Sequence, residues 1–500
     1  MITFNQPGTC FNERKNFKYN IDLGATLKIM VINIFVPTVA DLIPFGITTR
    51  RYGYTVNMGI FSTGSHSGWP SSSLPLLTSG NSTINMTTQE GSLLTSVTPL
   101  TVPLGCIITA VMMKSMGRKT LLLLCPIPLI ASWLLIAMAT SKIHLYIGRA
   151  LGGFIDGAIF NVGPAYISEI ADAEVRGLFG TSIMVSFGSG IVLFNVFVTF
   201  MSSESIAYLI AALTLPMLFT IPFVPESPYY CLLKGDSEEA ELSLKKLKGK
   251  QDIQGDLDRI SRSILEHGEA KGKVTDILTK KHFRRCICTS IMLSSTQHLS
   301  GNSAIQFYLE TLFQNSRSIS SKTINCIYYV GFFVASIVSP LLVDISGRKT
   351  LVLVSTGSTT VTLFATGTFM YFKNSLGHDT YVGYVQLLLL LLQAVTYSSG
   401  LHTIPMLVAS EIFPSNLVGT ALCLINIIYS ISISATVFLF ERTYYSMGTY
   451  VPFFLFGIFC LCGMMLISMF LIETKGKTLE KIQNEIRRSK LRKVGNCDSQ

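Results

Sequence analysis

Long apolar segments alternate with short polar loops along most of this chain. A helix needs about 20 mainly apolar residues to cross a bilayer. Twelve stretches fit that length, six on each side of a charged stretch at 234–285, near residues 52–77, 93–113, 119–140, 144–166, 179–201, 206–224, 284–312, 324–343, 350–372, 383–409, 420–440 and 449–472. The pattern predicts an all-α membrane protein with twelve transmembrane helices in two six-helix bundles.

A short basic turn is repeated at the same place in both halves. Gly-Arg-Lys-Thr occurs at Gly117–Thr120 and at Gly347–Thr350, each time between two apolar segments. Further landmarks recur in the same order: Pro164, Glu169, Gly177 and Glu226 in the first half, and Pro405, Glu411, Gly419 and Glu473 in the second. Parallel repeats of membrane helices build transporters, whose substrate site lies between the halves near the bilayer midplane.

The apolar stretch at 24–47 does not fit the twelve-span pattern. It contains Pro37, Asp41 and Pro44, and a thirteenth span would move one terminus to the other side of the membrane. We therefore read it as interfacial or disordered rather than spanning. The predicted organisation is an N-terminal segment at 1–50, a bundle at 51–230, a cytoplasmic loop with short helices at 231–283, a second bundle at 284–473 and a cytoplasmic tail at 474–500.

Composition supports the membrane class and argues against an enzyme. The chain is 49% hydrophobic and 14% charged, whereas soluble domains carry about 25% charged residues. Its eleven cysteines show no zinc or redox spacing. We find no phosphate-binding loop and no nucleophile motif. The sequence therefore predicts a protein without catalytic residues, metal or cofactor.

Charge fixes the expected orientation. Most Lys and Arg residues lie in the two basic turns, in the stretch 234–285 and in the tail. Basic loops stay in the cytoplasm, so both termini are expected there. The net charge of +10 then reflects topology and an anionic inner leaflet, not nucleic-acid binding. Both Asn-x-Ser/Thr sequons, at Asn81 and Asn85, fall in the first predicted outer loop, where glycosylation is possible.

Several motifs occur in an order typical of one family. They are Gly68-Trp69-Pro70-Ser71, Gly148-Arg149, Pro164-x-Tyr166-Ile167-Ser168-Glu169, Arg176-Gly177, Pro225-Glu226-Ser227-Pro228, Gln297-x-x-Ser300-Gly301-Asn302-Ser303, Asp344-x-x-Gly347-Arg348-Lys349 and Glu473-Thr474-Lys475-Gly476. Over residues 52–482 the chain resembles the sugar porters of the major facilitator superfamily, and within them the insect facilitated trehalose and glucose transporters. The resemblance implies a multi-pass carrier of the plasma membrane.

The resemblance also implies a mechanism and a substrate site. The expected function is facilitative uniport of a sugar, such as trehalose or a hexose, by alternating access. A proton-coupled sugar or polyol carrier and a non-transporting sugar sensor remain alternatives. The implied substrate-binding residues are Gln297, His298, Asn302, Ser303 and Asn426. An amide both donates and accepts, as a sugar hydroxyl requires, although intramembrane amides also join helices to one another.

Charged residues at the cytoplasmic ends of the spans form an implied gate. Opposite charges at one level can pair when that side closes and separate when it opens, and exposed pairs contribute only about 0–1 kcal/mol each. The alternative is that the basic residues only anchor the loops to the membrane surface. The implied gate residues are Arg118, Lys119, Glu169, Arg176, Glu226, Asp344, Arg348, Lys349, Glu411 and Glu473.

The chain departs from the family pattern at gate and site. Lys114 stands where the family has an acid, Tyr229 and Val418 stand where it has Arg, and helix 10 lacks the usual Gly-Pro pair and Trp. In the implied site, His298, Met184 and Phe332 replace amides. These replacements leave open which sugar is carried and whether transport is retained.

One carboxylate is present in addition to the family pattern. Asp156 lies midway along the fourth span, seven residues after Arg149 and so close to its face. With His66, His298 and His402 it can form a proton-responsive pocket. Alternatively, Asp156 offsets Arg149 or bonds a neighbour, and the histidines are neutral packing residues.

Overall fold

The computed structural model describes residues 47–79, 84–171, 176–249, 253–268, 279–313, 320–373, 380–413, 415–475, 477, 482 and 485. Of the stretch at 24–47, predicted to be interfacial or disordered, residues 24–46 lie outside them, and Ile47 begins the first described helix. Helices α3–α9, which we call the first bundle, are α3 (Ile47–Thr78), α4 (Thr88–Met116), α5 (Arg118–Leu124), α6 (Pro126–Ala137), α7 (Lys142–Ile170), α8 (Arg176–Phe197) and α9 (Ser203–Thr220), followed by the 3₁₀ turn η2 (Ile221–Phe223).

Helices α14–α22 form what we call the second bundle. They are α14 (Lys281–Leu299), α15 (Asn302–Phe307), α16 (Leu309–Phe313), α17 (Ser321–Ser346), α18 (Arg348–Phe372), α19 (Thr380–Thr396), the π-helical turn η3 (Tyr397–Leu401), α20 (Ile404–Ile412), α21 (Ser415–Ser446) and α22 (Val451–Phe470). Between the bundles lie α10 (Pro228–Lys234), α11 (Ser237–Lys248) and α12 (Gln254–Gly268).

The described part of the chain contains helices and no strand, which confirms the all-α class. Eight of its helical stretches are long and apolar enough to cross a membrane. Helices also overlap each of the other predicted spans. The count of twelve crossings and the exact domain boundaries stay predictions.

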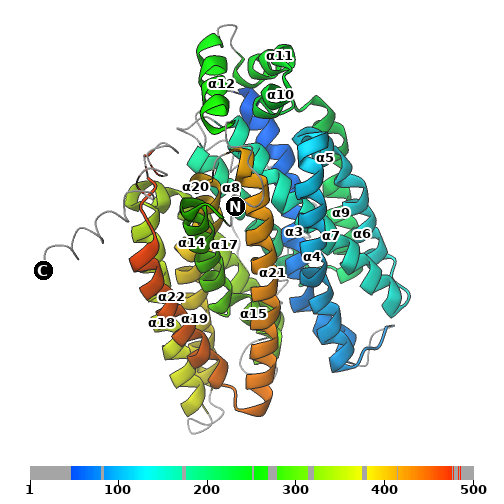
Figure 1. Ribbon diagram of the computed structural model, residues 1–500. Coiled ribbons are helices and arrows are strands. Elements are labelled where there is room, and N and C mark those ends of the chain that lie inside the picture. The colour runs from blue at the N-terminus through cyan, green and yellow to red at the C-terminus, as the bar shows by residue number, and fades with distance from the viewer. Residues whose placement is uncertain are drawn as a thin grey trace, which may run out of the picture. The chain divides into compact units, whose positions relative to one another are not determined.

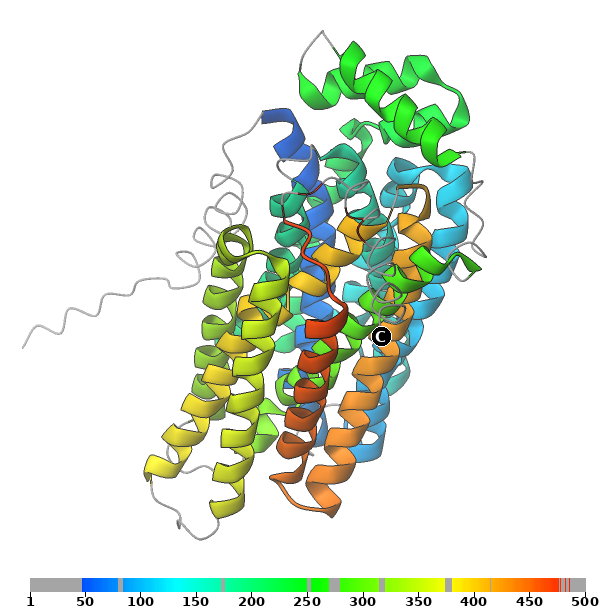
Figure 2. The same ribbon diagram turned by 60° about the vertical axis from the view of Figure 1, so that its left-hand side comes forward.

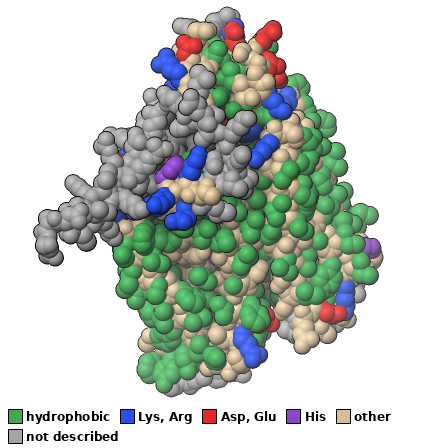
Figure 3. All heavy atoms as spheres, viewed as in Figure 1, with side chains coloured by type: hydrophobic (Ala, Val, Ile, Leu, Met, Phe, Trp, Pro, Cys, Tyr) green, Lys and Arg blue, Asp and Glu red, His purple; other side chains and the backbone are tan. Residues whose placement is uncertain are grey.

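Surface chemistry separates the spanning helices from the segment that joins the two bundles. Helices α10–α12 lie together at one end of the long helices (Figures 1 and 2). They share a small apolar cluster around Leu244, Ile253 and Ile260. The face shown in Figure 3 is largely hydrophobic along the long helices, and charged side chains gather over α10–α12. This division suits a lipid-facing belt with one water-facing end.

Glycines let α3 and α8 approach each other closely in the first bundle. A Cβ atom at Gly64 would overlap the backbone carbonyl oxygen of Phe187, and one at Gly190 would overlap that of Phe61. Small residues at such contacts allow the dispersion contacts that hold helices together in lipid. The two helices therefore pack backbone to backbone.

Two spanning segments of the second bundle are interrupted. Between α14 and α15, Gly301 adopts a positive φ of 78°. Between α19 and α20, Tyr397–Leu401 form the π-helical turn η3. Interruptions of this kind in membrane helices are tolerated where the backbone is buried or lines a cavity, and they accompany substrate sites. The first interruption adjoins His298, Asn302 and Ser303, which the sequence places at the substrate site, and the second adjoins His402, which it places in the proton-responsive pocket.

Candidate functional site

The two interrupted segments bring Gln297 and two histidines together. Gln297, near the end of α14, donates from Nε2 to the backbone oxygen of His402 at 2.9 Å. His402 follows η3 directly and lies 5.8 Å from the ring of Tyr397. His298 packs edge-on against Tyr429 of α21, with ring centroids 4.0 Å apart. The structure thus brings α14, the turn between η3 and α20, and α21 together around these side chains.

Several polar atoms in this cluster are buried without a partner. Both ring nitrogens of His298, Nε2 of His402 and Oδ1 of Asn302 form no hydrogen bond with any residue that the structure describes, although none of these residues is more than 5% exposed. An unpaired buried polar group costs about 1–3 kcal/mol, so each one in a native protein calls for an explanation, such as an ordered water or a bound group. A neutral histidine offers one donor and one acceptor, so it matches a hydroxyl group as an amide does.

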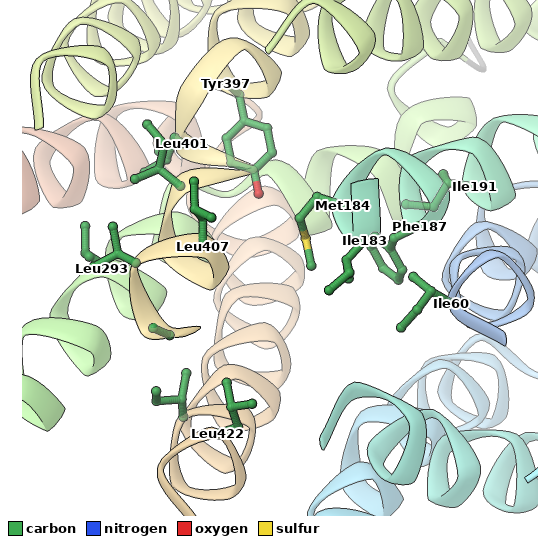
Figure 4. Packing of buried hydrophobic residues seen from close by; sticks show 14 of the residues in the cluster. Ile60, Ile183, Met184, Phe187, Ile191, Leu293, Tyr397, Leu401, Leu407 and Leu422 are labelled. Atoms are coloured by element: carbon green, nitrogen blue, oxygen red, sulfur yellow. The ribbon is translucent and has the colours of Figure 1, made fainter. Parts of the chain in front are cut away.

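The opposite face, from the first bundle, is apolar. Figure 4 shows Ile183, Met184 and Phe187 of α8 beside Ile60 of α3, with Tyr397 and Leu407 of the second bundle across from them. The ring of Phe187 lies 6.3 Å from that of His402. Phe332 of α17 lies 5.2 Å from the same imidazole. Of the residues that replace family amides, Phe332 therefore packs on His402, and Met184 lies near Tyr397 in Figure 4.

Two other implied site residues behave differently. Asn426 of α21 donates from Nδ2 to the backbone oxygen of Phe160 on α7 at 3.3 Å, a bond between the bundles. This is the helix-joining role that the sequence left open for it. Ser303 lies half-buried on α15. The sequence did not single out Tyr429, although it lies one helical turn after Asn426 on the same face.

The first basic turn is bound by two carboxylates. Gly117 adopts a φ of 80°, a conformation that favours glycine. Arg118 pairs with Glu169 of α7, with Nη2 2.7 Å from Oε1. The backbone N–H groups of Arg118 and Lys119 donate to Glu226 at 2.9 and 3.2 Å.

The second basic turn repeats this arrangement. Gly347 has a φ of 82°, and Arg348 pairs with Glu411 at 2.9 Å. The N–H groups of Arg348 and Lys349 each donate to Glu473 at 2.9 Å. Burial alone would raise the pKa of the Glu473 carboxyl, but four backbone N–H donors together hold that pKa below its ordinary value.

Each of these described ion pairs lies within one bundle. Arg118 and Glu169 belong to the first bundle, and Arg348 and Glu411 to the second. The side chains of Arg176 and Asp344, also expected at the gate, lie outside the described residues. So does Asn81, whereas Asn85 is described and exposed.

Asp156, the added carboxylate, pairs with a residue that the sequence analysis did not identify as its partner. Asp156 Oδ1 lies 2.9 Å from His66 Nδ1 on α3. Arg149 donates from Nη1 to the backbone oxygen of His66 at 2.6 Å and stands over the ring of Trp69. Asp156 bonds His66 and also interacts electrostatically with Arg149, although no ion pair within 4.0 Å joins it to Arg149 among the described residues.

Comparison with known proteins identifies the family of the chain. Residues 28–486 match the profile of the family described as "Sugar (and other) transporter". The chain belongs to this sugar transporter family. The motifs quoted from its sequence, its helical fold and its two basic turns are thus those of a multi-pass membrane protein of that family.

Relatives of this sugar transporter family member include three insect proteins. Each is described as a facilitated trehalose transporter: one of Culex quinquefasciatus is 32% identical over 86% of this chain and 84% of its own length. One of Polypedilum vanderplanki is 30% identical and is covered over 86% of its length. One of Aedes aegypti is 31% identical, and this chain spans 54% of it. This chain thus spans only about half the length of some relatives.

Solved structures support the same fold for the family member. The proton:xylose symporter XylE, of the major facilitator superfamily, matches with a TM-score of 0.74 and 20% identity, over 87% of this chain and 98% of its own. The human organic anion transporter MFSD10 matches with a TM-score of 0.59 and 14% identity, over 84% of this chain and 100% of its own. Together with the family match, these likenesses confirm the major facilitator fold that the sequence predicted.

Proposed function

We propose that this chain is a facilitative sugar transporter that carries trehalose or a hexose as a uniporter. The observation that carries the proposal is the set of unpartnered polar atoms on His298, Asn302 and His402, beside the Gln297 amide. Relatives covered over most of their length are described as facilitated trehalose transporters. The chemistry of this cluster suits an uncharged polyhydroxylated ligand.

The proposed mechanism uses the two bundles differently. The second bundle hydrogen-bonds sugar hydroxyls through Gln297, His298, Asn302 and His402, while Met184 and Phe187 of the first bundle contact the carbon faces of the sugar ring. Rocking of one bundle against the other then opens the site to each side in turn. The pairs Arg118–Glu169 and Arg348–Glu411 brace the cytoplasmic ends of their own bundles.

Uptake into proteoliposomes tests this function. Purified protein should equilibrate radiolabelled trehalose or glucose across the membrane, and unlabelled substrate outside should compete. Uptake should stop at equal inner and outer concentrations whether or not a proton gradient is imposed. If correctly folded protein takes up no sugar, the transporter proposal is wrong. Binding of labelled sugar by the same sample would then favour the non-transporting sugar sensor.

A proton-coupled carrier is the second candidate, because one feature favours it. The buried His66–Asp156 pair holds titratable groups inside the first bundle. A coupled carrier would accumulate sugar above the outer concentration when the outside is acidic. That accumulation, collapsed by a protonophore, would replace the uniport proposal.

The proposed topology places both termini in the cytoplasm of a plasma-membrane protein. In that topology the loop between α3 and α4, which contains exposed Asn85, faces outward and accepts a glycan. Deglycosidase treatment should increase gel mobility, and the shift should vanish in the Asn81→Gln/Asn85→Gln double variant. Labelling of an N-terminal epitope on intact cells would contradict this topology.

A further inference from the structure

A hydroxyl group of α18 lies inside the backbone ladder of the π-helical turn η3. Ser355 donates from Oγ to the backbone oxygen of Thr396 at 2.6 Å. The same Oγ accepts from the backbone N–H of Leu401 at 2.9 Å, while the backbone oxygen of Tyr397 lies farther away, at 3.5 Å. The partners fix both directions, because a carbonyl oxygen only accepts and an N–H only donates. Thr396 and Leu401 are five residues apart, the spacing of a π-helical hydrogen bond, so Ser355 bridges the donor and acceptor of one such step.

Close packing of η3 on α18 makes this bridge possible. A Cβ atom at Gly400 would lie 2.9 Å from Cβ of Ser355 and 3.0 Å from the backbone oxygen of Leu351. The turn therefore rests directly against α18 because residue 400 is a glycine. Ser355 is only 1% exposed, so bulk water does not reach the bridge. Side chains that insert into a helical ladder interrupt the helix, which gives the break between α19 and α20 a physical cause.

The turn in turn sets the position of His402, the residue that follows it. The backbone N–H of His402 donates to the oxygen of Tyr397 at 3.0 Å, a second step of five residues. The carbonyl oxygen of His402 accepts from Gln297 at 2.9 Å, and its Nε2 has no partner among the described residues. One backbone path thus leads from the Ser355 hydroxyl to two groups of the proposed site.

Contacts with α17 support the same turn in another way. Ser398 donates to the backbone oxygen of Phe332 at 2.9 Å, and the hydroxyl of Ser339 lies 2.8 Å from that of Thr403. In both contacts it is a side chain of the turn region that is bound. Ser355 differs, because it bonds main-chain groups on both sides of the residues that bend.

We propose that Ser355 is the positioning residue of the substrate site. Its hydroxyl keeps η3 π-helical and so fixes where the imidazole and the carbonyl oxygen of His402 stand beside Gln297. This inference rests on the proposed function, which it deepens by naming what sets the sugar affinity. An alanine at 355 leaves the Thr396 carbonyl and the Leu401 N–H without their bridge, so the turn loosens and the site loses its alignment.

Amide hydrogen exchange reads the turn in detergent without sugar. In Ser355→Ala, the peptide covering Tyr397–His402 should exchange about tenfold faster than in wild type, because the Leu401 N–H loses its acceptor. The control is Thr356→Val, which removes a neighbouring buried hydroxyl that bonds its own helix at Val352. That control should leave the exchange of this peptide unchanged. Wild-type exchange in Ser355→Ala would overturn the proposal at its first step.

Sugar affinity is the second readout. Ser355→Ala should raise the KM for uptake, and the Kd for labelled sugar in detergent, about fivefold to tenfold, while the maximal rate per surface molecule changes about twofold or less. A purely structural role would instead reduce the amount of folded carrier and leave the KM of the remainder unchanged. Faster exchange with an unchanged KM would therefore overturn the positioning role. Thr356→Val should keep the wild-type KM.

A double variant tests the path through His402. In a Gln297→Ala background, Ser355→Ala should raise the KM further by only about twofold or less, because both residues act on the same carbonyl and neighbouring changes are not additive. Full additivity would mean that Ser355 acts elsewhere. If wild type itself neither takes up nor binds sugar, the proposed function is wrong and the positioning role falls with it, whereas the exchange result for the turn stands.

A second substitution covers a failure of Ser355→Ala to fold. Ser355→Cys fills nearly the same space beside Gly400, but a thiol is a weak donor and a weak acceptor. It should show the same two changes, in exchange and in KM, with smaller size. Wild-type values of both in folded Ser355→Cys would overturn the proposal.

Discussion

The buried histidines of the first and second bundles are used in different ways. In the first bundle, His66, Asp156 and Ser132 bond one another, and Arg149 bonds the backbone beside them. In the second bundle, both ring nitrogens of His298 and Nε2 of His402 have no partner among the described residues. Satisfied polar groups stabilise the structure that contains them, whereas unsatisfied ones leave hydrogen bonds for a ligand. On the proposed function, hydrogen bonding to the sugar rests mainly on the histidines and amides of the second bundle, whereas His66 of the first bundle holds its own helices together.

Backbone geometry shows the same contrast. Helices α3 and α8 of the first bundle meet backbone to backbone at Gly64. In the second bundle, Gly457 of α22 meets the ring of Phe364, where a Cβ atom would lie 3.2 Å away. A side chain can turn aside more easily than a backbone. The interruptions at Gly301 and at Tyr397–Leu401 also fall in the second bundle.

The largest expected effect tests this difference in packing. Gly64→Ala should destabilise the first bundle by about 3 kcal/mol or more, because the added methyl meets the Phe187 backbone and overpacking forces the helices apart. Gly457→Ala should cost about 1 kcal/mol or less, because the Phe364 ring can move. The yield of monodisperse protein and its unfolding temperature in detergent measure both. Equal losses would remove the packing contrast.

Sequence alone was sufficient for the fold class and the family, because apolar segment length and ordered motifs depend on local residues. It also predicted the repeated turns, where Arg118 and Arg348 hold equivalent carboxylates. It missed the pairing of His66 with Asp156, since those residues lie 90 positions apart. Periodicity shows which face a residue occupies but not which distant helix covers that face. For the same reason it could not decide that Asn426 bonds the other bundle.

The next effect tests recognition. Gln297→Ala should lower uptake about tenfold at normal surface expression, because it removes an amide from the site and leaves the His402 carbonyl oxygen without its donor; about 1.4 kcal/mol corresponds to that factor. Met184→Ala, on the apolar face of the first bundle, should lower uptake about threefold or less. Initial rates normalised to surface protein give the comparison. A larger loss from Met184→Ala would place recognition on the first bundle.

A smaller effect concerns Glu226 and Glu473, the carboxylates that accept from the backbone N–H groups of the two basic turns. Glu473→Gln should lower the unfolding temperature by about 2–4 °C at pH 7.5, since an amide accepts more weakly from the four N–H donors. The folded pKa of Glu473 lies below the ordinary 4.5. Its stabilisation is therefore complete above pH 4.5 and is lost as the pH falls through the folded value.

The difference between Glu473→Gln and wild type should accordingly shrink when unfolding is measured below about pH 4.5. Glu226→Gln provides the matched variant in the first bundle, where Glu226 accepts from the Arg118 and Lys119 N–H groups. A similar loss at neutral pH is expected, because the two turns have the same geometry. A loss confined to one variant would show that the turns are equivalent in shape but not in energy.

The smallest effect concerns the charge beside the first turn. Lys114 is exposed at the end of α4, where the second half has Asp344. It adds a cation next to Arg118 and Lys119, and exposed charges of this kind contribute about half a kcal/mol. Lys114→Asp should therefore shift the carrier toward its cytoplasm-closed, outward-open state by about twofold.

The opposite end of α4 can report that shift. There Ser92 donates to Glu441 of α21 at 3.0 Å, a bond between the bundles, so a Ser92→Cys variant should label faster when the outer side opens. Lys246→Asp, on exposed α11, makes the same charge change away from the turn and should leave labelling unchanged. Equal labelling rates in Lys114→Asp and its parent would mean that Lys114 only anchors α4 to the membrane surface. The cytoplasmic ends of the two bundles would then differ in charge without differing in gating.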